Sequence, residues 1–208
     1  MVRIWFATRC AIALLAIGAF AQGASREGQP IRLTGSLGEQ TYCRGDRDTF
    51  SIHFRLALHA VNQTSDALIV IGNFGKADYT VQMARTAEEL DEGKYEYNPN
   101  LDYFEDLPDA PRDADLSKEF IVLKPDDTFE STTNVAVVAS HGLGRPARGT
   151  VTPGKHSMQV TLSAWPYRDP PDETAKRWKQ YGRLVAQPLT TEPIAIDIPP
   201  DAPVYSCR

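Results

Sequence analysis

The sequence has few residues of the kinds that metal centres and nucleophilic active sites require. It contains four histidines and three cysteines among 208 residues. His53 and His59, six residues apart in one predicted strand, would lie about 20 Å apart, too far to share a metal ion. No G-x-S-x-G elbow occurs, and Ser140-His141 are adjacent only in sequence. We therefore expect no catalytic residue, no cofactor and no metal ion.

Basic charge is also in deficit, since 22 lysines and arginines stand against 27 aspartates and glutamates, for a net charge of −5. An acidic balance argues against a nucleic-acid partner, because such partners are held through phosphate contacts to Lys and Arg. No apolar run after the first 21 residues approaches the roughly 20 residues that span a bilayer. We expect no membrane span once the N-terminal segment described next is removed.

The N-terminal segment has the features of an export signal. Arg3 and Arg9 precede the apolar run Cys10–Phe20, and Ala19-Phe20-Ala21 places small residues where a signal peptidase cleaves. The run is too short for a membrane span, which disfavours a retained anchor. We predict a signal peptide over residues 1–21, with Ala24 as the second choice of cleavage site, then a flexible N-terminus over 22–30. The protein should be periplasmic or secreted.

Two cysteines remain after the signal, Cys43 and Cys207. An even number of cysteines in an oxidising compartment favours a disulfide, and two free thiols are the alternative. The bridge would close a very long loop and would tie the C-terminal tail to an early strand. The entropy model puts its contribution at roughly 4–5 kcal/mol.

Alternation of apolar and polar residues marks several strands. The clearest covers 50–60, where apolar residues from Phe50 to Leu58 alternate with polar ones. Turn residues separate most of the candidate segments. Further strands are predicted over 31–33, 67–71, 79–83, 120–123, 129–138, 156–165 and 194–198. These segments predict an all-β fold, a sandwich of about eight strands with one short helix, in a single domain over 31–208.

Residues 86–116 interrupt the strand pattern with eleven acidic and two basic residues. The segment also holds four aromatic residues, too many for a purely disordered tract. We interpret it as a long, partly ordered excursion between strands. The excursion could bind calcium, but its spacing is not that of an EF-hand loop, and a solvated acidic loop is favoured. The residues considered for calcium are Asp102, Asp106, Asp109, Asp113 and Asp115.

The one predicted helix covers 170–181. Asp169 is its expected N-cap, Pro170 its first residue, and Gly182 its stop. Ala175, Trp178 and Tyr181 form the expected inward stripe. Aromatic residues gather in and before this helix, and we consider them either as packing against the sheet or as a binding patch. The residues of this possible patch are Trp165, Tyr167, Trp178 and Tyr181.

Two stretches resemble exported bacterial immunoglobulin-like domains, including those similar to the intracellular proteinase inhibitor of bacilli. One is the strand, asparagine turn and strand over 61–70. The other is the pair of turn-containing segments 123–129 and 151–156. The segments 160–167 and 191–194 resemble uncharacterised secreted proteins of the same build. The resemblance implies an immunoglobulin-like β-sandwich, and it implies fold far more than activity.

The export signal and the absence of a site motif favour a non-enzymatic β-sandwich protein that binds a macromolecule or acts as an accessory domain. Its partner would be an unidentified protein or polysaccharide. The resemblance alone suggests a secreted proteinase inhibitor as the alternative. Its inhibitory loop would be 140–150, with Arg145 and Arg148. A small hydrolase ranks third.

Overall fold

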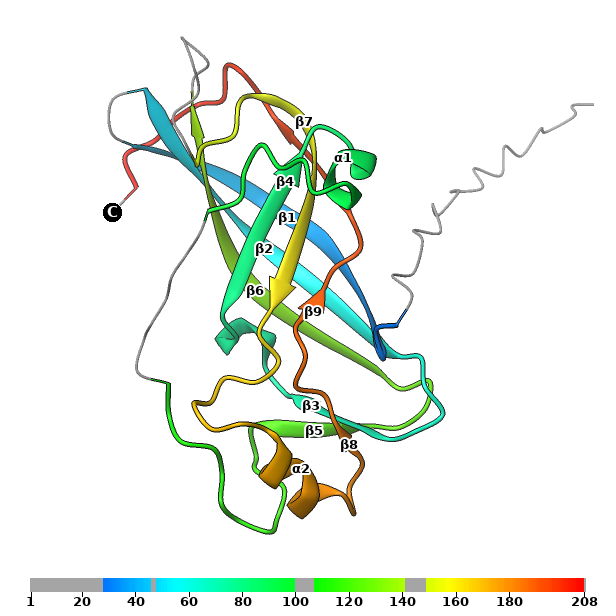
Figure 1. Ribbon diagram of the computed structural model, residues 1–208. Helices are drawn as coiled ribbons and strands as arrows, with labels where there is room; N and C mark the ends of the chain where they lie inside the picture. The colour runs from blue at the N-terminus through cyan, green and yellow to red at the C-terminus, as the bar shows by residue number, and fades with distance from the viewer. Residues whose placement is uncertain (1–27, 46–47, 100–106, 141–148, 208) are drawn as a thin grey trace, which may run out of the picture.

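The computed structural model describes residues 28–45, 48–99, 107–140 and 149–207. Within these ranges the chain forms ten strands, two α-helices and one 3-10 helix (Figure 1). The strands form sheets in which most pairings are antiparallel. The predicted all-β sandwich is therefore confirmed. The signal peptide predicted over 1–21 and residues 22–27 of the predicted N-terminal segment lie outside the described residues.

The first layer is sheet A, in which the order of strands is β1-β2-β6 and both pairings are antiparallel. Alternate side chains of β2, from Phe50 to Ala60, are buried, while most of those between them are exposed. This is the period-two pattern that the sequence predicted, and it leaves one face of sheet A toward solvent. The strands are β1 (Ile31–Arg44), β2 (Thr49–Asn62) and β6 (Thr128–Ser140).

The second layer is sheet C, with strand order β10-β7-β4 and a short strand, β9, that also pairs with β7. Helix α1 (Ala87–Asp91) lies against β4 and β7 and buries Leu90 completely. One side of sheet C is thus partly covered by the acidic excursion. The strands are β4 (Tyr79–Ala84), β7 (Gly154–Leu162), β9 (Leu189–Thr190) and β10 (Ile194–Ile198).

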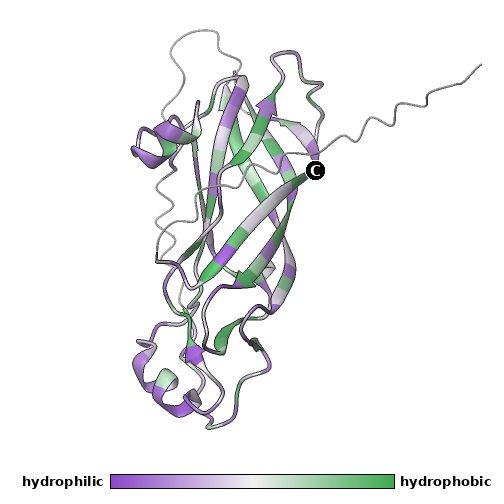
Figure 2. Ribbon diagram, turned by 90° about the vertical axis from the view of Figure 1, so that its right-hand side faces the viewer, coloured by the Kyte–Doolittle hydropathy of each residue, from purple (hydrophilic) through white to green (hydrophobic). Residues whose placement is uncertain are grey.

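The core lies between sheets A and C. Phe54 and Leu56 of β2 belong to the same buried cluster as Val160 of β7 and Ile196 of β10. Hydrophobic and hydrophilic residues alternate along these strands (Figure 2), so each sheet has one apolar face turned inward. Burial of this apolar surface is the main favourable contribution to folding.

A third, smaller layer closes one end of the sandwich (Figure 1). Sheet B has the order β5-β3-β8, and α2 lies beside it. Phe120 of β5 contacts the rings of Trp165, Tyr167 and Trp178, and Trp178 is fully buried. The elements of this layer are β3 (Leu68–Ile71), β5 (Phe120–Leu123), β8 (Arg183–Leu184) and α2 (Asp172–Trp178). A 3-10 helix (Phe74–Lys76) connects β3 to β4.

Strand β1 is much longer than the predicted segment 31–33. The stretch after Leu33 contains Gly35 and Gly38 and lacks regular alternation, so the pattern gave no strand signal there. In the structure the two glycines permit close packing. A Cβ on Gly35 would lie 2.6 Å from Ile194 Cδ1, and one on Gly38 would lie 3.1 Å from Arg55 O. The pairing with β2 also shifts register between Leu37 and Gln40, as at a β-bulge.

The predicted helix over 170–181 is shorter in the structure, and Asp169 is not its N-cap. Helix α2 begins at Asp172 after Pro171, which makes no side-chain capping hydrogen bond. The Asp169 carboxylate instead accepts a hydrogen bond of 3.0 Å from the backbone N–H of Ala110. A contact with a distant segment therefore replaces the local cap. Thr174 and Trp178 are the buried residues of α2, whereas Ala175 is only partly buried. Strand β7 also ends earlier than predicted, at Leu162.

Candidate functional site

The outer face of sheet A consists of the side chains of β1, β2 and β6 that point away from the core. The register of the three strands aligns these side chains in rows across the sheet. Most of them are exposed. Neighbouring rows are Thr34–His59–Glu130, then Ser36–Ala57–Thr132, then Arg55–Asn134, and then Thr41–His53–Ala136.

A groove of about 580 Å³ crosses this face, and we call it the sheet A groove. The short side chains of the row Ser36, Ala57 and Thr132 are part of its lining. His59 and Glu130 line one side, with imidazole Nδ1 3.8 Å from a carboxylate oxygen. The backbone N–H of Phe74 donates a hydrogen bond of 3.2 Å to Ser131 Oγ of β6. This contact places the preceding residues Gly72 and Asn73, which also line the groove, beside the edge of β6.

A second hollow of about 370 Å³ continues the same face toward the disulfide end. Arg55 lines this hollow, and its Nη2 donates a hydrogen bond of 3.2 Å to Thr132 Oγ1 in the sheet A groove. The two depressions therefore form one polar surface. Other residues that line the second hollow include Glu39, Thr41, His53, Tyr79, Asn134 and Ala136.

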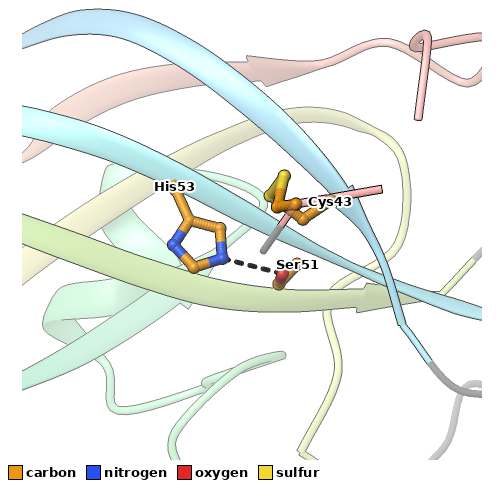
Figure 3. The surroundings of a disulfide bond; sticks show 4 residues. Cys43, Ser51 and His53 are labelled. Atoms are coloured by element: carbon orange, nitrogen blue, oxygen red, sulfur yellow. Dashed lines mark hydrogen bonds between the residues drawn. A yellow bond between two sulfur atoms is a disulfide. The ribbon is translucent and has the colours of Figure 1, made fainter. Parts of the chain in front are cut away.

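Cys43 and Cys207 form the disulfide that the sequence predicted, with their Cα atoms 5.3 Å apart. The bridge lies beside Ser51 and His53 at one end of sheet A (Figure 3). Tyr205 of the tail pairs with the free edge of β1, since its N–H donates to Tyr42 O and its carbonyl accepts from Arg44 N. The tail thus covers this end of the β1 edge.

Ser51 and His53 share a hydrogen bond of 2.8 Å between Oγ and Nε2 (Figure 3). A serine nucleophile also needs an acid that orients the histidine and donors that stabilise an oxyanion. The described residues show no carboxylate bonded to the other nitrogen of His53. The pair lies on the polar surface of sheet A. Ser140 is buried, and His141 lies outside the described residues.

A second polar cluster lies at the start of β7. Arg85 Nε is 2.9 Å from Glu96 Oε2, and the N–H of Thr152 donates a hydrogen bond of 3.0 Å to Glu96 Oε1. Arg85 also reaches the carbonyl of Pro153 at 3.3 Å. The cluster ties the acidic excursion to the turn before β7, so we interpret it as structural.

His156 is the buried member of this cluster, 4% exposed. Its Nε2 donates to the carbonyl of Thr152 at 2.7 Å, so in the neutral ring Nδ1 carries no proton. Nδ1 lies 3.5 Å from Glu96 Oε2 and has no hydrogen-bond partner among the described residues. Burial is the main cause that lowers the pKa of His156, and the nearby Arg85 adds to it, although Thr152 and Glu96 act in the opposite direction. The folded protein therefore favours the neutral ring.

The aromatic residues considered as a binding patch pack within the third layer. Trp178 is fully buried and Tyr167 is 8% exposed, while Trp165 and Tyr181 are partly buried. The indole N–H groups of Trp165 and Trp178 donate to the carbonyls of Asp169 and Asp113. These rings thus stabilise the layer around Phe120 and leave little surface for a partner.

Other sequence-based candidates fall partly outside the described residues. Arg145 and Arg148 of the predicted inhibitory loop lie there, as do Asp102 and Asp106 of the calcium hypothesis. Asp109, by contrast, lies near two arginines: its Oδ2 is 3.8 Å from Arg112 Nη2, and its Oδ1 is 3.9 Å from Arg168 Nη1. In the part of the chain that the structure describes, no group of three or more His, Cys, Asp or Glu side chains could hold a metal ion.

Comparisons with models of known protein families, with curated proteins and with solved structures found no match for this chain. Across the described ranges, no helix is both long enough and apolar enough to cross a membrane.

Sequence reasoning missed the sheet A groove. Alternation over 50–60 already indicated which side chains of β2 point outward, including Ala57 and His59. The partner rows depend on the register with β1 and β6, which one sequence does not reveal. The one signal in the sequence that could have indicated the groove was the outward face of β2, where short side chains such as Ala57 lie between longer polar ones.

Proposed function

We propose that this protein is a non-enzymatic binding module that works outside the cytoplasm and holds a neutral polysaccharide on the outer face of sheet A. The observation that carries the proposal is the sheet A groove, about 580 Å³ in volume, in which hydroxyl, imidazole and carboxylate groups lie beside the apolar side chains of Ala57, Leu58 and Phe129. Groups of these kinds donate and accept hydrogen bonds to sugar hydroxyls, directly or through water.

The composition of the face favours a polysaccharide over a protein partner. Protein interfaces obtain most of their binding energy from buried aromatic, apolar and arginine anchors. Among the described residues, the large hydrophobic side chains that are exposed are Val138 and Tyr205. Only Val138 is on this face, and Arg55 already bonds to Thr132. A hydroxyl-rich ligand needs no large apolar anchor.

The rigidity of the face also supports this function. The groove lies on three long strands that pair along most of their length, so its hydrogen-bonding groups are held in place before a ligand arrives. Short side chains such as Ser36 and Thr132 lose little rotamer freedom on binding. Preorganisation of this kind lowers the cost of binding.

The charges of the face fit a neutral polymer. One arginine, Arg55, and two glutamates, Glu39 and Glu130, line the two depressions, so their net charge is only −1. A strongly acidic polysaccharide would find no surplus of positive charge here, and a strongly basic one would find a surplus of a single carboxylate. The disulfide supports the extracytoplasmic site of action, since such bonds persist in oxidising compartments.

Affinity electrophoresis of the oxidised protein in gels that contain neutral polysaccharides tests the proposal. We expect at least one neutral glycan, such as a β-glucan, xylan or mannan, to retard the protein, and alginate to have no effect. Ala57→Arg should fill the groove and weaken retardation about tenfold, which corresponds to 1.4 kcal/mol. Ala195→Arg, an exposed alanine of β10 in sheet C, is the matched control and should behave as the wild type. If no neutral glycan retards the protein, or both variants bind equally, the proposal is wrong.

A further inference from the structure

A pocket of about 450 Å³ lies where the third layer meets the sandwich, and we call it the side pocket. Pockets of this size, with mainly apolar walls and a few polar groups, are typical of small-molecule sites. Its apolar walls come from segments that are far apart in the sequence. They are formed by Ile71, Leu107, Pro108, Ile121, Pro166 and Tyr167.

Backbone hydrogen bonds hold the separate walls of the side pocket in place. The N–H of Gly72 donates to Glu119 O at 2.7 Å, and the N–H of Arg168 donates to Pro108 O at 2.9 Å. A Cβ on Gly72 would lie 3.1 Å from Ile121 Cγ2 and 3.3 Å from Glu119 O, so the close approach of these segments favours glycine. The pocket is therefore preformed.

The polar lining of the side pocket carries more negative than positive charge. Asp78 and Glu119 contribute carboxylates and Lys118 contributes one ammonium group. The Tyr167 hydroxyl donates a hydrogen bond to Glu119 Oε2, which orients this carboxylate beside the apolar wall. In the described part of the chain, neither carboxylate forms an ion pair with Lys118.

We propose that the side pocket binds a small amphiphilic amine, with its aromatic or aliphatic body against Ile121 and Pro166 and its cationic group between Asp78 and Glu119. Charge complementarity selects this class of ligand, because an ammonium group forms charge-assisted hydrogen bonds with carboxylates. Burial, the hydrogen bond to Glu119 and its charge all raise the pKa of Tyr167, so its hydroxyl remains a donor that positions Glu119. The side pocket meets the sheet A groove only at Gly72 and Asn73, and the two proposals are independent.

Three probes of similar shape separate the chemistry of the pocket: 2-phenylethylamine, 2-phenylethanol and 3-phenylpropanoate. Trp165 provides an internal reporter, because its ring centroid lies 4.9 Å from that of Tyr167. Tryptophan fluorescence titration, with calorimetry as the second readout, should show saturable binding of the amine. The alcohol should bind about tenfold more weakly, and the carboxylate should not bind.

The double variant Asp78→Asn/Glu119→Gln should remove the preference for the amine while it retains the fold, since both side chains are on exposed residues. Glu130→Gln, in the sheet A groove, is the control and should retain the preference. Thermal unfolding followed by circular dichroism checks that each variant is folded. The proposal is overturned if the amine fails to bind the folded wild type, if the three probes bind alike, or if the folded double variant keeps the preference.

Discussion

Tyr205 lies beside Cys43 in a parallel β-bridge, and Cys207, two residues later, is joined to Cys43 by a disulfide that spans 164 residues of chain. The tail thus pairs with the exposed edge of β1 through a single β-bridge. Unpaired strand edges favour association with other chains, and a covering segment is one way in which proteins protect them.

Cys207→Ser should lower the free energy of unfolding by about 2–5 kcal/mol, because the unfolded chain regains the freedom that the long loop had lost. Cys207 is exposed, so the substitution itself creates no cavity. Urea denaturation measures the effect, and the reduced wild type should match the variant. Hydrogen exchange at the Tyr205 amide should become faster in both. An unchanged urea midpoint would contradict this account of the tail.

The buried His156 should make the folded protein less stable as the pH falls below about 6.5. Burial lowers its folded-state pKa below the ordinary value of 6.5, while Glu96 and Arg85 face the ring with opposite charges. Near pH 6.5 the His156 imidazole therefore binds a proton in the unfolded chain more readily than in the folded chain. Stability should fall as pH drops from about 6.5 toward the folded pKa, by up to 1.4 kcal/mol per pH unit.

The variant His156→Gln keeps a side-chain N–H for Thr152 O but does not titrate. Its free energy of unfolding, from urea denaturation between pH 7 and pH 5, should fall less steeply than that of the wild type. His59→Gln, on the exposed face of sheet A, should keep the wild-type slope. Parallel curves for wild type and His156→Gln would show that the prediction is wrong.

Asn62 is a buried polar residue that joins sheet A to the third layer. Its Nδ2 donates to the carbonyls of Asp66, Leu123 and Lys124, at 2.8 to 3.0 Å, and its Oδ1 accepts from the N–H of Thr64. Asn62→Asp would place an acceptor against three carbonyl oxygens. We expect a loss of roughly 3–5 kcal/mol in the free energy of unfolding.

Thermal and urea denaturation at pH 7 measure the effect of Asn62→Asp. Asn134→Asp, an exposed position on β6, is the matched control and should change stability by less than about 0.5 kcal/mol. The prediction fails if the two substitutions cost the same.

Leu90 connects the acidic excursion to the sandwich. It is fully buried although α1 has only five residues, and Thr86 caps this helix by accepting a hydrogen bond from Glu89 N–H. Leu90→Ala should lower the free energy of unfolding by about 2–5 kcal/mol, through lost burial and the cavity that remains. Glu92→Ala removes only an exposed ion pair with Lys94 and should have little effect. Equal denaturation midpoints for the two variants would contradict the role assigned to Leu90.

Local pattern predicted most of the strands, but not β8, β9 or the greater part of β1, and the cysteine count predicted the disulfide. The segments 120–123 and 194–198 coincide with β5 and β10, because short apolar or alternating runs between turn residues leave few other solutions. Long-range contacts account for what was missed. Asp169 bonds to Ala110 and not to its own helix, and Gly35 and Gly38 serve close packing, which local propensity cannot reveal.

The candidate sites were harder to predict for the same reason. The sheet A groove requires the register of three strands, and the side pocket requires segments that are about 90 residues apart in sequence, such as Asp78 and Tyr167. The sequence indicated that Trp178 is important, and in the structure this side chain is fully buried. Its aromatic character did not reveal whether the ring would be buried or exposed, since both uses are common.

The most direct test of the central claim is a map of amide chemical-shift changes as ¹⁵N-labelled oxidised protein is titrated with oligosaccharides of the neutral glycans. Sheet A should respond at Ser36, Ala57 and Thr132, which line the groove. Amides of sheet C such as Ala195 should not change. Shift changes that cluster outside sheet A, or none at saturating oligosaccharide, would contradict the account.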